Sequence, residues 1–342
     1  MISASKPPAQ AQDWQAQWRQ ALIEPAELLR TLGLPHLAAR LSANAQASFP
    51  LRVPAVFIAR MRHADPDDPL LRQVLPVDEE DRIQPGFSLD AVGDLARASE
   101  RGVIHKYSGR ALLIATGSCA IHCRYCFRRH FPYADEHAAG ARWRDTVAHL
   151  AARTDINEVI LSGGDPWSLA TARLAELTDQ LRPLPHLRRL RIHTRLPVVL
   201  PARVDLALID WLGQLPWPLV IVIHANHANE LDQDVAAAIA RLRGTGAILL
   251  NQSVLLRGVN DRLDDQIALS ERLIELGVMP YYLHQLDRVQ GTAHFEVPDR
   301  EAERLIAALR ARVAGFMVPQ LVREIAGEAS KTPLQRASEG VP

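Results

Sequence analysis

The three cysteines of the chain, Cys119, Cys123 and Cys126, lie within eight residues and form the spacing C-x3-C-x2-C. Three thiolates on one loop can bind three corners of a cubane iron–sulfur cluster. Such clusters usually take four cysteines, so one iron would stay open to an exogenous ligand, as in catalytic metal sites. On ligand types alone, the alternative is a Cys3His zinc site that recruits His122 or His130.

A second candidate segment is Ser162-Gly163-Gly164-Asp165, which directly follows an aliphatic run. Two adjacent glycines permit backbone conformations and close approaches that side chains forbid. Taken alone, the pair is equally typical of a tight turn. Its place after a predicted strand favours a ligand-binding loop.

Short aliphatic runs recur after residue 100 and alternate with amphipathic segments of helical spacing, among them 168–181, 230–243 and 263–276. Repeated strand–helix units predict a parallel sheet, either doubly wound or barrel-like. In both architectures ligands bind beyond the carboxyl ends of the strands, which is where both candidate segments lie. The six expected strands span 112–115, 158–161, 190–193, 220–224, 248–251 and 280–283.

The remaining sequence suggests how the chain is divided. Helical spacing over 13–45 and a loop-like composition over 50–85 indicate an N-terminal accessory segment, residues 1–100. We expect the core to span 101–333 and a tail to span 334–342.

Composition narrows the classes of partner. The chain has 342 residues with 39 basic and 39 acidic side chains, so it lacks the positive charge typical of nucleic-acid binding. No apolar run approaches the roughly 20 residues that span a bilayer, and the first residues lack the apolar stretch of a secretory signal. We therefore expect a cytoplasmic protein with neither a nucleic-acid nor a membrane partner.

The cysteine spacing, with the aromatic Tyr125 before the third cysteine, resembles the signature of the radical S-adenosylmethionine superfamily. The resemblance implies a [4Fe-4S] cluster on Cys119, Cys123 and Cys126. Its open iron would bind S-adenosyl-L-methionine, which an electron from the cluster cleaves to a 5′-deoxyadenosyl radical. A flavodoxin- or ferredoxin-type electron donor is then expected.

The same resemblance extends to further residues and to the fold. Ser162, Gly163, Gly164 and Asp165 resemble that superfamily's glycine-rich segment for the methionyl amino group. The implied fold is an α/β, partial (βα)6 TIM-like barrel with an N-terminal, mainly helical accessory segment. The adenosyl side of the cofactor site is matched by His224 and Gln252.

Over roughly 102–333 the chain resembles one branch of the superfamily, the lysine 2,3-aminomutases. This resemblance implies an isomerase that moves the α-amino group of L-lysine to the β-carbon with the help of pyridoxal 5′-phosphate. The matching segments are CFRR at 126–129, NQSVLLRGVND at 251–261, PYYL at 280–283, GTAHF at 291–295 and ASKTP at 329–333.

Within that family resemblance, Lys331 is the residue that carries pyridoxal phosphate as a Schiff base. An amine suits this role, whereas a guanidinium does not deprotonate in proteins. Lys106, Tyr107 and Arg110 match the contacts to the cofactor phosphate, for which cations and a hydroxyl are suitable.

The resemblance also assigns three substrate contacts. Arg128 matches the residue that holds the substrate carboxylate, and Asp287 and Glu324 match two acids that hold its distal ammonium. A buried ion must be paired, so two carboxylates favour a cationic side chain. Glu324 departs from the family pattern, because longer members have Asp at this position.

The chain stops soon after Lys331, whereas those longer members carry a C-terminal extension with additional cysteines. Together with the segment REIAGE at 323–328, this resembles the branch that makes (R)-β-lysine for elongation factor P, which implies a link to the ligase acting on that factor. Two alternatives stay open: a 2,3-aminomutase for arginine or ornithine, and a zinc-stabilised, non-catalytic module.

Overall fold

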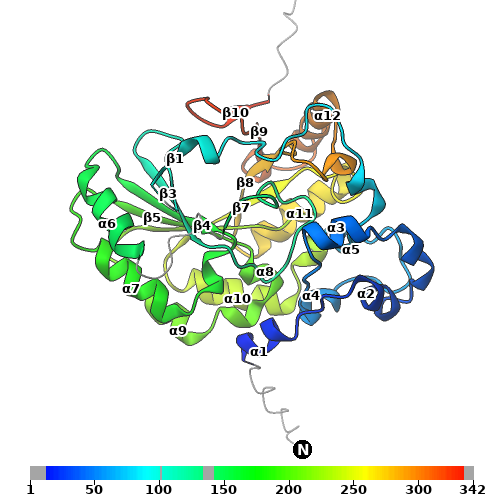
Figure 1. Ribbon diagram of the computed structural model, residues 1–342, viewed down its shortest axis with the longest axis horizontal. Helices are drawn as coiled ribbons and strands as arrows, with labels where there is room; N and C mark the ends of the chain where they lie inside the picture. Colours follow the sequence, from blue (N-terminus) through cyan, green and yellow to red (C-terminus); the bar gives the residue numbers. More distant parts are fainter. Residues whose placement is uncertain (1–12, 101, 134–141, 335–342) are drawn as a thin grey trace, which may run out of the picture.

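The computed structural model describes residues 13–100, 102–133 and 142–334. Its main feature is a ten-stranded sheet whose strands follow one another in chain order (Figure 1). Strands β3 to β9 pair in parallel, and β1, β2 and β10 add antiparallel strands at the two ends. The strands are β1 (Ala98–Glu100), β2 (Val103–Ile104), β3 (Arg110–Thr116), β4 (Glu158–Gly163), β5 (Arg189–Thr194), β6 (Leu219–Ile223), β7 (Ile248–Val254), β8 (Met279–His284), β9 (Gln320–Arg323) and β10 (Thr332–Pro333).

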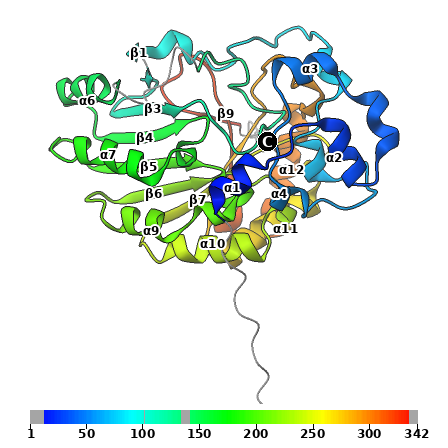
Figure 2. The ribbon, with the colours of Figure 1, turned by 60° about the horizontal axis from the view of Figure 1, so that its bottom comes forward.

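Helices connect each parallel strand to the next, so the expected α/β architecture is confirmed (Figures 1 and 2). The described ladders do not pair β10 with β1, so the barrel stays open on one side. Within the described ranges, no helix combines the length and the apolar character needed to cross a lipid bilayer. The connecting helices are α6 (Arg142–Ala152), α7 (Thr171–Leu181), α8 (Leu196–Val199), η5 (Pro201–Arg203), α9 (Leu206–Gly213), α10 (Gln233–Arg243), α11 (Leu263–Glu275) and α12 (Asp299–Arg310), and shorter 3-10 turns are η4 (Pro166–Ser168), η6 (Ala228–Glu230), η7 (Ala293–Phe295) and η8 (Gly315–Met317).

The six predicted strands coincide with β3 to β8, with ends that differ by at most three residues, but the sheet has a seventh parallel strand that the sequence pattern does not indicate. This strand, β9, pairs with β8 and has only four residues, of which Leu321 and Val322 are buried. So short a run gives too little periodicity to be recognised. Strand β10 then folds back on β9, with Thr332 opposite Arg323.

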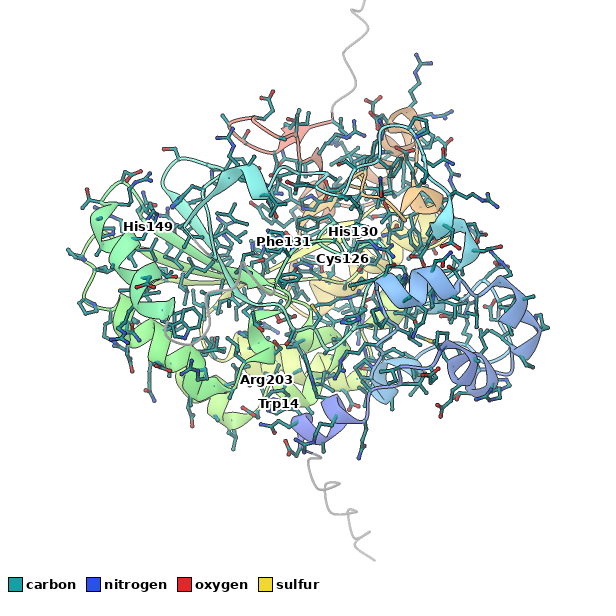
Figure 3. All side chains as sticks on the ribbon, in the orientation of Figure 1. Trp14, Cys126, His130, Phe131, His149 and Arg203 are labelled. Carbon is teal, nitrogen blue, oxygen red and sulfur yellow. The ribbon has the colours of Figure 1, made fainter. Side chains whose placement is uncertain are left out.

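The N-terminal segment packs beside α11 and α12 (Figures 1 and 2) and shares its core with the barrel. One cluster of buried apolar side chains contains Leu28 and Phe57 together with Leu113 and Ile221 of the sheet. Figure 3 shows Trp14 next to Arg203, whose guanidinium lies 4.7 Å from the centroid of the indole ring. The segment's helices are α1 (Trp14–Arg19), α2 (Pro25–Thr31), η1 (Pro35–Arg40), α3 (Ala43–Ser48), α4 (Ala55–Ile58), α5 (Pro69–Arg72), η2 (Asp78–Asp81) and η3 (Leu95–Arg97).

A buried carboxylate ties this segment to the cysteine loop. Glu80 in η2 accepts hydrogen bonds from Arg124 Nε (2.8 Å) and Nη2 (2.6 Å) and from Arg129 Nη2 (2.6 Å). The three side chains are at most 2% exposed. Both guanidinium groups also lie over the ring of Phe49. Burial of these charges is tolerated because both guanidinium groups bind the carboxylate of Glu80.

Replacing Glu80 with Ala should destabilise the fold, because two buried guanidinium groups lose their carboxylate. Removing one partner of a buried pair typically lowers the free energy of unfolding by about 3 kcal/mol or more. Urea unfolding followed by circular dichroism measures the change. The control is Asp155→Ala, which removes a surface pair with Arg153 and should leave the midpoint unchanged. Equal midpoints for Glu80→Ala and the wild type would contradict the structural role of this network.

Candidate active site

A cavity of about 520 Å³ lies at the carboxyl ends of the parallel strands. In this cavity the cysteine loop and the segment 162–165 meet the C-terminal hairpin β9–β10. The structure thus brings together every predicted site residue, although their individual roles stay predictions. These cavity residues are Lys106, Tyr107, Arg110, Cys119, Cys123, Cys126, Arg128, Ser162, Gly163, Gly164, Asp165, His224, Gln252, Asp287, Glu324 and Lys331.

The three cysteines lie on the loop after β3, and Figure 3 places Cys126 in the middle of the molecule. Burial raises the pKa of the Cys119 thiol well above its usual range and that of Cys126 to about 11, and the neighbouring cysteines add to the rise. Sulfurs in such surroundings become thiolates beside a strong positive charge. The donor set therefore fits a bound metal centre.

Each of the two histidines of the zinc alternative has a ring nitrogen near a backbone carbonyl oxygen of another segment. His122 Nδ1 is 2.7 Å from the carbonyl oxygen of Pro50, and its ring stacks on Phe49. His130 Nε2 is 3.2 Å from the carbonyl oxygen of Gln290. In the described part of the chain, no three His, Cys, Asp or Glu side chains lie close enough to hold one metal ion.

The paired glycines are required by the approach of the cysteine loop. A Cβ atom on Gly163 would lie 2.5 Å from the carbonyl oxygen of Thr116, and the φ angle of Gly163 is +123°. A Cβ atom on Gly164 would lie 2.5 Å from the carbonyl oxygen of Ser118. Any side chain there would push the end of β4 away from the loop that carries the cysteines.

The carboxylate of Asp165 is used by the protein itself. It accepts hydrogen bonds from the hydroxyl of Thr194 (2.8 Å) and from the backbone N–H groups of Trp167 (3.0 Å), Arg195 (2.7 Å) and Leu196 (3.1 Å). Burial raises its pKa to about 6 against the effect of these hydrogen bonds. Asp165 thus holds the ends of β4 and β5 together, which positions the cavity wall.

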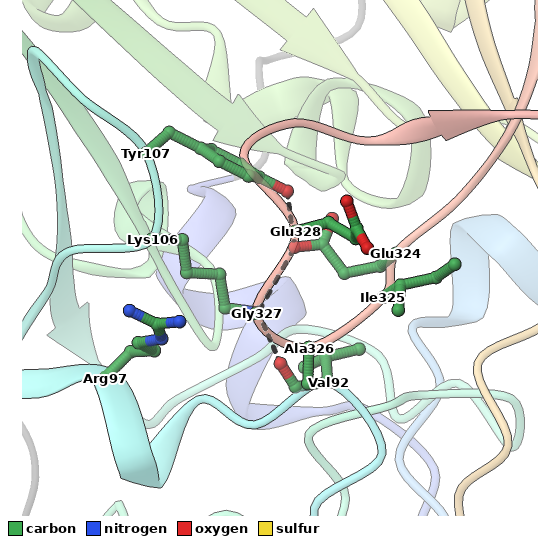
Figure 4. Close-up of a pocket in the computed structure, with 9 residues that line it drawn as sticks. All are labelled: Val92, Arg97, Lys106, Tyr107, Glu324, Ile325, Ala326, Gly327 and Glu328. Carbon is green, nitrogen blue, oxygen red and sulfur yellow. Dashed lines mark hydrogen bonds and ion pairs between the residues drawn. The ribbon is translucent and has the colours of Figure 1, made fainter.

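Lys331 and Glu324 form the centre of a second group of charges. The hairpin β9–β10 brings Lys331 Nζ to 2.6 Å from Glu324 Oε2. The other oxygen, Oε1, accepts from the hydroxyl of Tyr107 (2.6 Å) and from Lys106 Nζ (3.3 Å) (Figure 4). Burial would raise the pKa of Glu324, but the charges of Lys331 and Lys106 lower it to about 2. Glu324 is therefore ionised.

Two more of the predicted cations share one acid. Asp94 lies 2.6 Å from Lys106 Nζ and 2.7 Å from Arg128 Nε, and Arg128 Nη1 also donates to Ser162 Oγ (3.2 Å). Arg110 differs from both, since no carboxylate of the described residues pairs with it. Its guanidinium lies 5.0 Å from the centroid of the Tyr107 ring. Arg110 is therefore well placed to receive an anionic ligand.

Burial shifts the pKa of both Asp287 and His224 toward the uncharged form of the side chain. Burial raises the pKa of Asp287 to about 7, partly opposed by the charge of Lys331. No cation within the described ranges forms an ion pair with this carboxyl group. Burial lowers the pKa of His224 to about 3, so its imidazole is neutral; its Nε2 lies 2.9 Å from Gln252 Nε2.

Several other cavity residues carry no motif by which the sequence alone would identify them. Most lie at the ends of β5 and β8, so strand position is the signal that points to them. Asp94 precedes the sheet, and no pattern in the sequence indicates it. The additional wall residues include Asp94, Arg191, His193, Arg195 and His284.

The raised pKa of Asp287 predicts that the free energy of unfolding depends on pH. Its carboxyl has a pKa of about 7 in the folded protein and an ordinary value of 3.8, so the folded state binds more protons between pH 4 and 7. Stability therefore falls as the pH rises through this window. Asp287→Asn should remove the effect and stabilise the protein at pH 8, by up to about 4 kcal/mol. Urea unfolding of both proteins at pH 5 and pH 8 tests this; a difference that does not grow with pH would refute it.

Comparison with known proteins decides the family. The chain is 48% identical to the L-lysine 2,3-aminomutase of Escherichia coli (strain K12) over 324 residues, which cover 94% of each chain. The chain belongs to the L-lysine 2,3-aminomutase family. This confirms the resemblance drawn from the motifs. No model of a protein family matches the chain.

Two further relatives show how far the family similarity reaches. The L-lysine 2,3-aminomutase of Haemophilus influenzae is 43% identical over 321 residues, which cover 94% of this chain and 95% of that protein. The L-lysine 2,3-aminomutase of Clostridium subterminale is 31% identical over 323 residues, 94% of this chain but 77% of that protein. Each match covers 94% of this chain and therefore includes the cysteine loop.

Proposed function

We propose that this member of the family is a radical S-adenosylmethionine isomerase that uses pyridoxal 5′-phosphate to convert L-α-lysine to β-lysine. One observation carries the proposal: residues predicted for the cluster, for both cofactors and for the substrate line a single cavity. The names of the relatives agree with this reaction.

Three groups would share the cavity. The cysteines would hold a [4Fe-4S] cluster, Ser162, Gly163 and Gly164 would lie beside S-adenosylmethionine, and Lys331 would bind pyridoxal phosphate, whose phosphate suits Arg110. When bound, these groups supply the radical that removes a hydrogen atom and the electron sink that lets nitrogen migrate. The protein binds and orients them and excludes water.

The substrate's two charged ends would meet opposite charges. Arg128 is held by Asp94 and Ser162, so its guanidinium is fixed where a substrate carboxylate would bind. Glu324 now holds the amine of Lys331. If that amine held the cofactor, Oε2 of Glu324 would be free to pair with the substrate's distal ammonium, while Lys106 would stay at Oε1.

Asp287 would complete the recognition of this ammonium. Its pKa of about 7 means that much of it is protonated at neutral pH. A cation beside it favours the charged form, so binding of a cationic side chain would release a proton. A glutamate substrate would be repelled, because its side chain would add a third carboxylate to those of Asp287 and Glu324.

We also propose that the product is (R)-β-lysine and that it modifies elongation factor P in the cytoplasm. The likeness of the segment 323–328 to that branch of the family supports this. The partners would be a flavodoxin- or ferredoxin-type electron donor and the ligase for elongation factor P. A 2,3-aminomutase for arginine or ornithine is the second candidate, because Asp287 and Glu324 would pair with any cationic side chain.

An anaerobic assay distinguishes a lysine 2,3-aminomutase from an aminomutase for arginine or ornithine. We expect protein reconstituted with iron and sulfide to convert L-lysine to one enantiomer of β-lysine when S-adenosylmethionine, pyridoxal phosphate and dithionite are present. Chiral chromatography should identify it as (R)-β-lysine. Parallel incubations with L-arginine and L-ornithine should give no β-amino acid. Faster conversion of either would favour the second candidate, and the S enantiomer would refute the link to elongation factor P.

Substituting Lys331 with Ala tests the cofactor attachment. The variant should lose the visible absorption band of bound pyridoxal phosphate and the activity, because no amine remains to bond the cofactor, while the iron–sulfur spectrum stays. Lys106→Arg is the matched control, since it keeps a cation near the cofactor and should keep the band. A band that survives in Lys331→Ala would show that another group binds the cofactor.

A further inference from the structure

Arg195 lies against a cysteine sulfur in the cavity wall. It directly follows β5, and its Nη1 is 2.6 Å from Sγ of Cys123. Its side chain is 7% exposed, and the guanidinium lies 5.6 Å from the centroid of the Tyr125 ring. An arginine so placed presents a fixed positive charge and an N–H donor to one of the three sulfurs.

The guanidinium is held there by a fully buried network. Its Nη2 donates to Gln73 Oε1 (2.7 Å) and to Glu230 Oε2 (2.8 Å). Both partners have no exposed surface. Glu230 Oε1 in turn accepts from Gln73 Nε2 (3.1 Å) and from the backbone N–H of Asn226 (2.9 Å). With the backbone of Arg195 also bound to Asp165, the guanidinium has little freedom to turn away from the sulfur.

A donor at a cluster's sulfur has a known electrostatic consequence. Reduction adds negative charge to the cluster and its thiolates, so a hydrogen bond or cation at sulfur favours the reduced state and raises the reduction potential. The effect is stronger in a buried site than in water. Glu230 acts in the opposite sense, because its buried negative charge opposes reduction.

We propose that Arg195, held by Gln73 and Glu230, raises the reduction potential of the cluster bound at Cys123. The inference rests on the proposed function, because it requires that cluster. One electron from an external low-potential donor converts [4Fe-4S]2+ to [4Fe-4S]+, and no bond to Arg195 forms or breaks. Arg195 is thus a positioning residue that acts on the electron-transfer step and not on the substrate.

A redox titration of the reconstituted protein, followed by electron paramagnetic resonance, tests this without measuring activity. Arg195→Gln should lower the equilibrium constant for reduction at least tenfold, which is a fall of about 59 mV in the midpoint of a one-electron couple. Arg195→Lys keeps the charge and should fall less. Glu230→Gln should shift the midpoint upward.

The opposite midpoint shifts of Arg195→Gln and Glu230→Gln distinguish an electrostatic role from a structural one. Structural damage to the site would lower the cluster content of both variants but would not shift their midpoints in opposite directions. Arg203→Gln is the matched control: it removes another buried arginine, which donates to the carbonyl oxygens of Trp167 and Leu169, and its midpoint should equal that of the wild type. If Arg195→Gln binds no cluster, Arg195→Lys and Glu230→Gln still decide. The inference about Arg195 would be wrong if every Arg195 variant that binds the cluster had the midpoint of the wild type. It would also be wrong if Arg195→Lys and Glu230→Gln both had that midpoint. Neither result would affect the proposed function. A wild-type protein with no reducible cluster would overturn the proposed function as well.

Discussion

Charge compensation inside one cavity is the constraint on which the site depends. Six cationic and four acidic side chains of the described residues line it, together with the three cysteines. Charges in such surroundings are tolerated only when paired. The protein supplies most of the partners itself: Asp94 for Arg128 and Lys106, Glu324 for Lys331, and Glu230 for Arg195.

The groups left over indicate what the cavity receives. Within the described ranges, Arg110 and Asp287 form no ion pair, while burial raises the pKa of the Cys119 and Cys126 thiols. An anion, a cation and a metal centre are the ligands that would restore the balance. These are the charge types of a cofactor phosphate, a lysine side chain and an iron–sulfur cluster. The same electrostatic requirement therefore connects three functional predictions that came from separate motifs.

The sequence carries most of the fold because parallel strands and their helices have strong periodicities. It also carries the cysteine loop, the glycine pair and Lys331, whose residue types and neighbours are distinctive. It does not reveal β9, which has four residues, or Asp94 and Arg195, which belong to no motif. The roles of Glu80 and Gln73 are also not visible in the sequence. Buried ion pairs and hydrogen bonds of this kind join residues far apart in the chain and leave no local pattern. The use of Asp165 as an anchor between β4 and β5 is likewise visible only in three dimensions.

The N-terminal segment has a larger part in the site than an accessory role implies. Arg124, Arg128 and Arg129 flank the second and third cysteines, and their carboxylate partners, Glu80 and Asp94, both come from this segment. The segment also supplies Gln73, which binds the guanidinium of Arg195. Without these partners, four arginines around the sulfurs would be buried without part or all of their compensation, and the cysteine loop would lose the contacts that fix it. The barrel presents the cysteines at the ends of its strands, but the segment that precedes it supplies the partners that hold the surrounding cations in place.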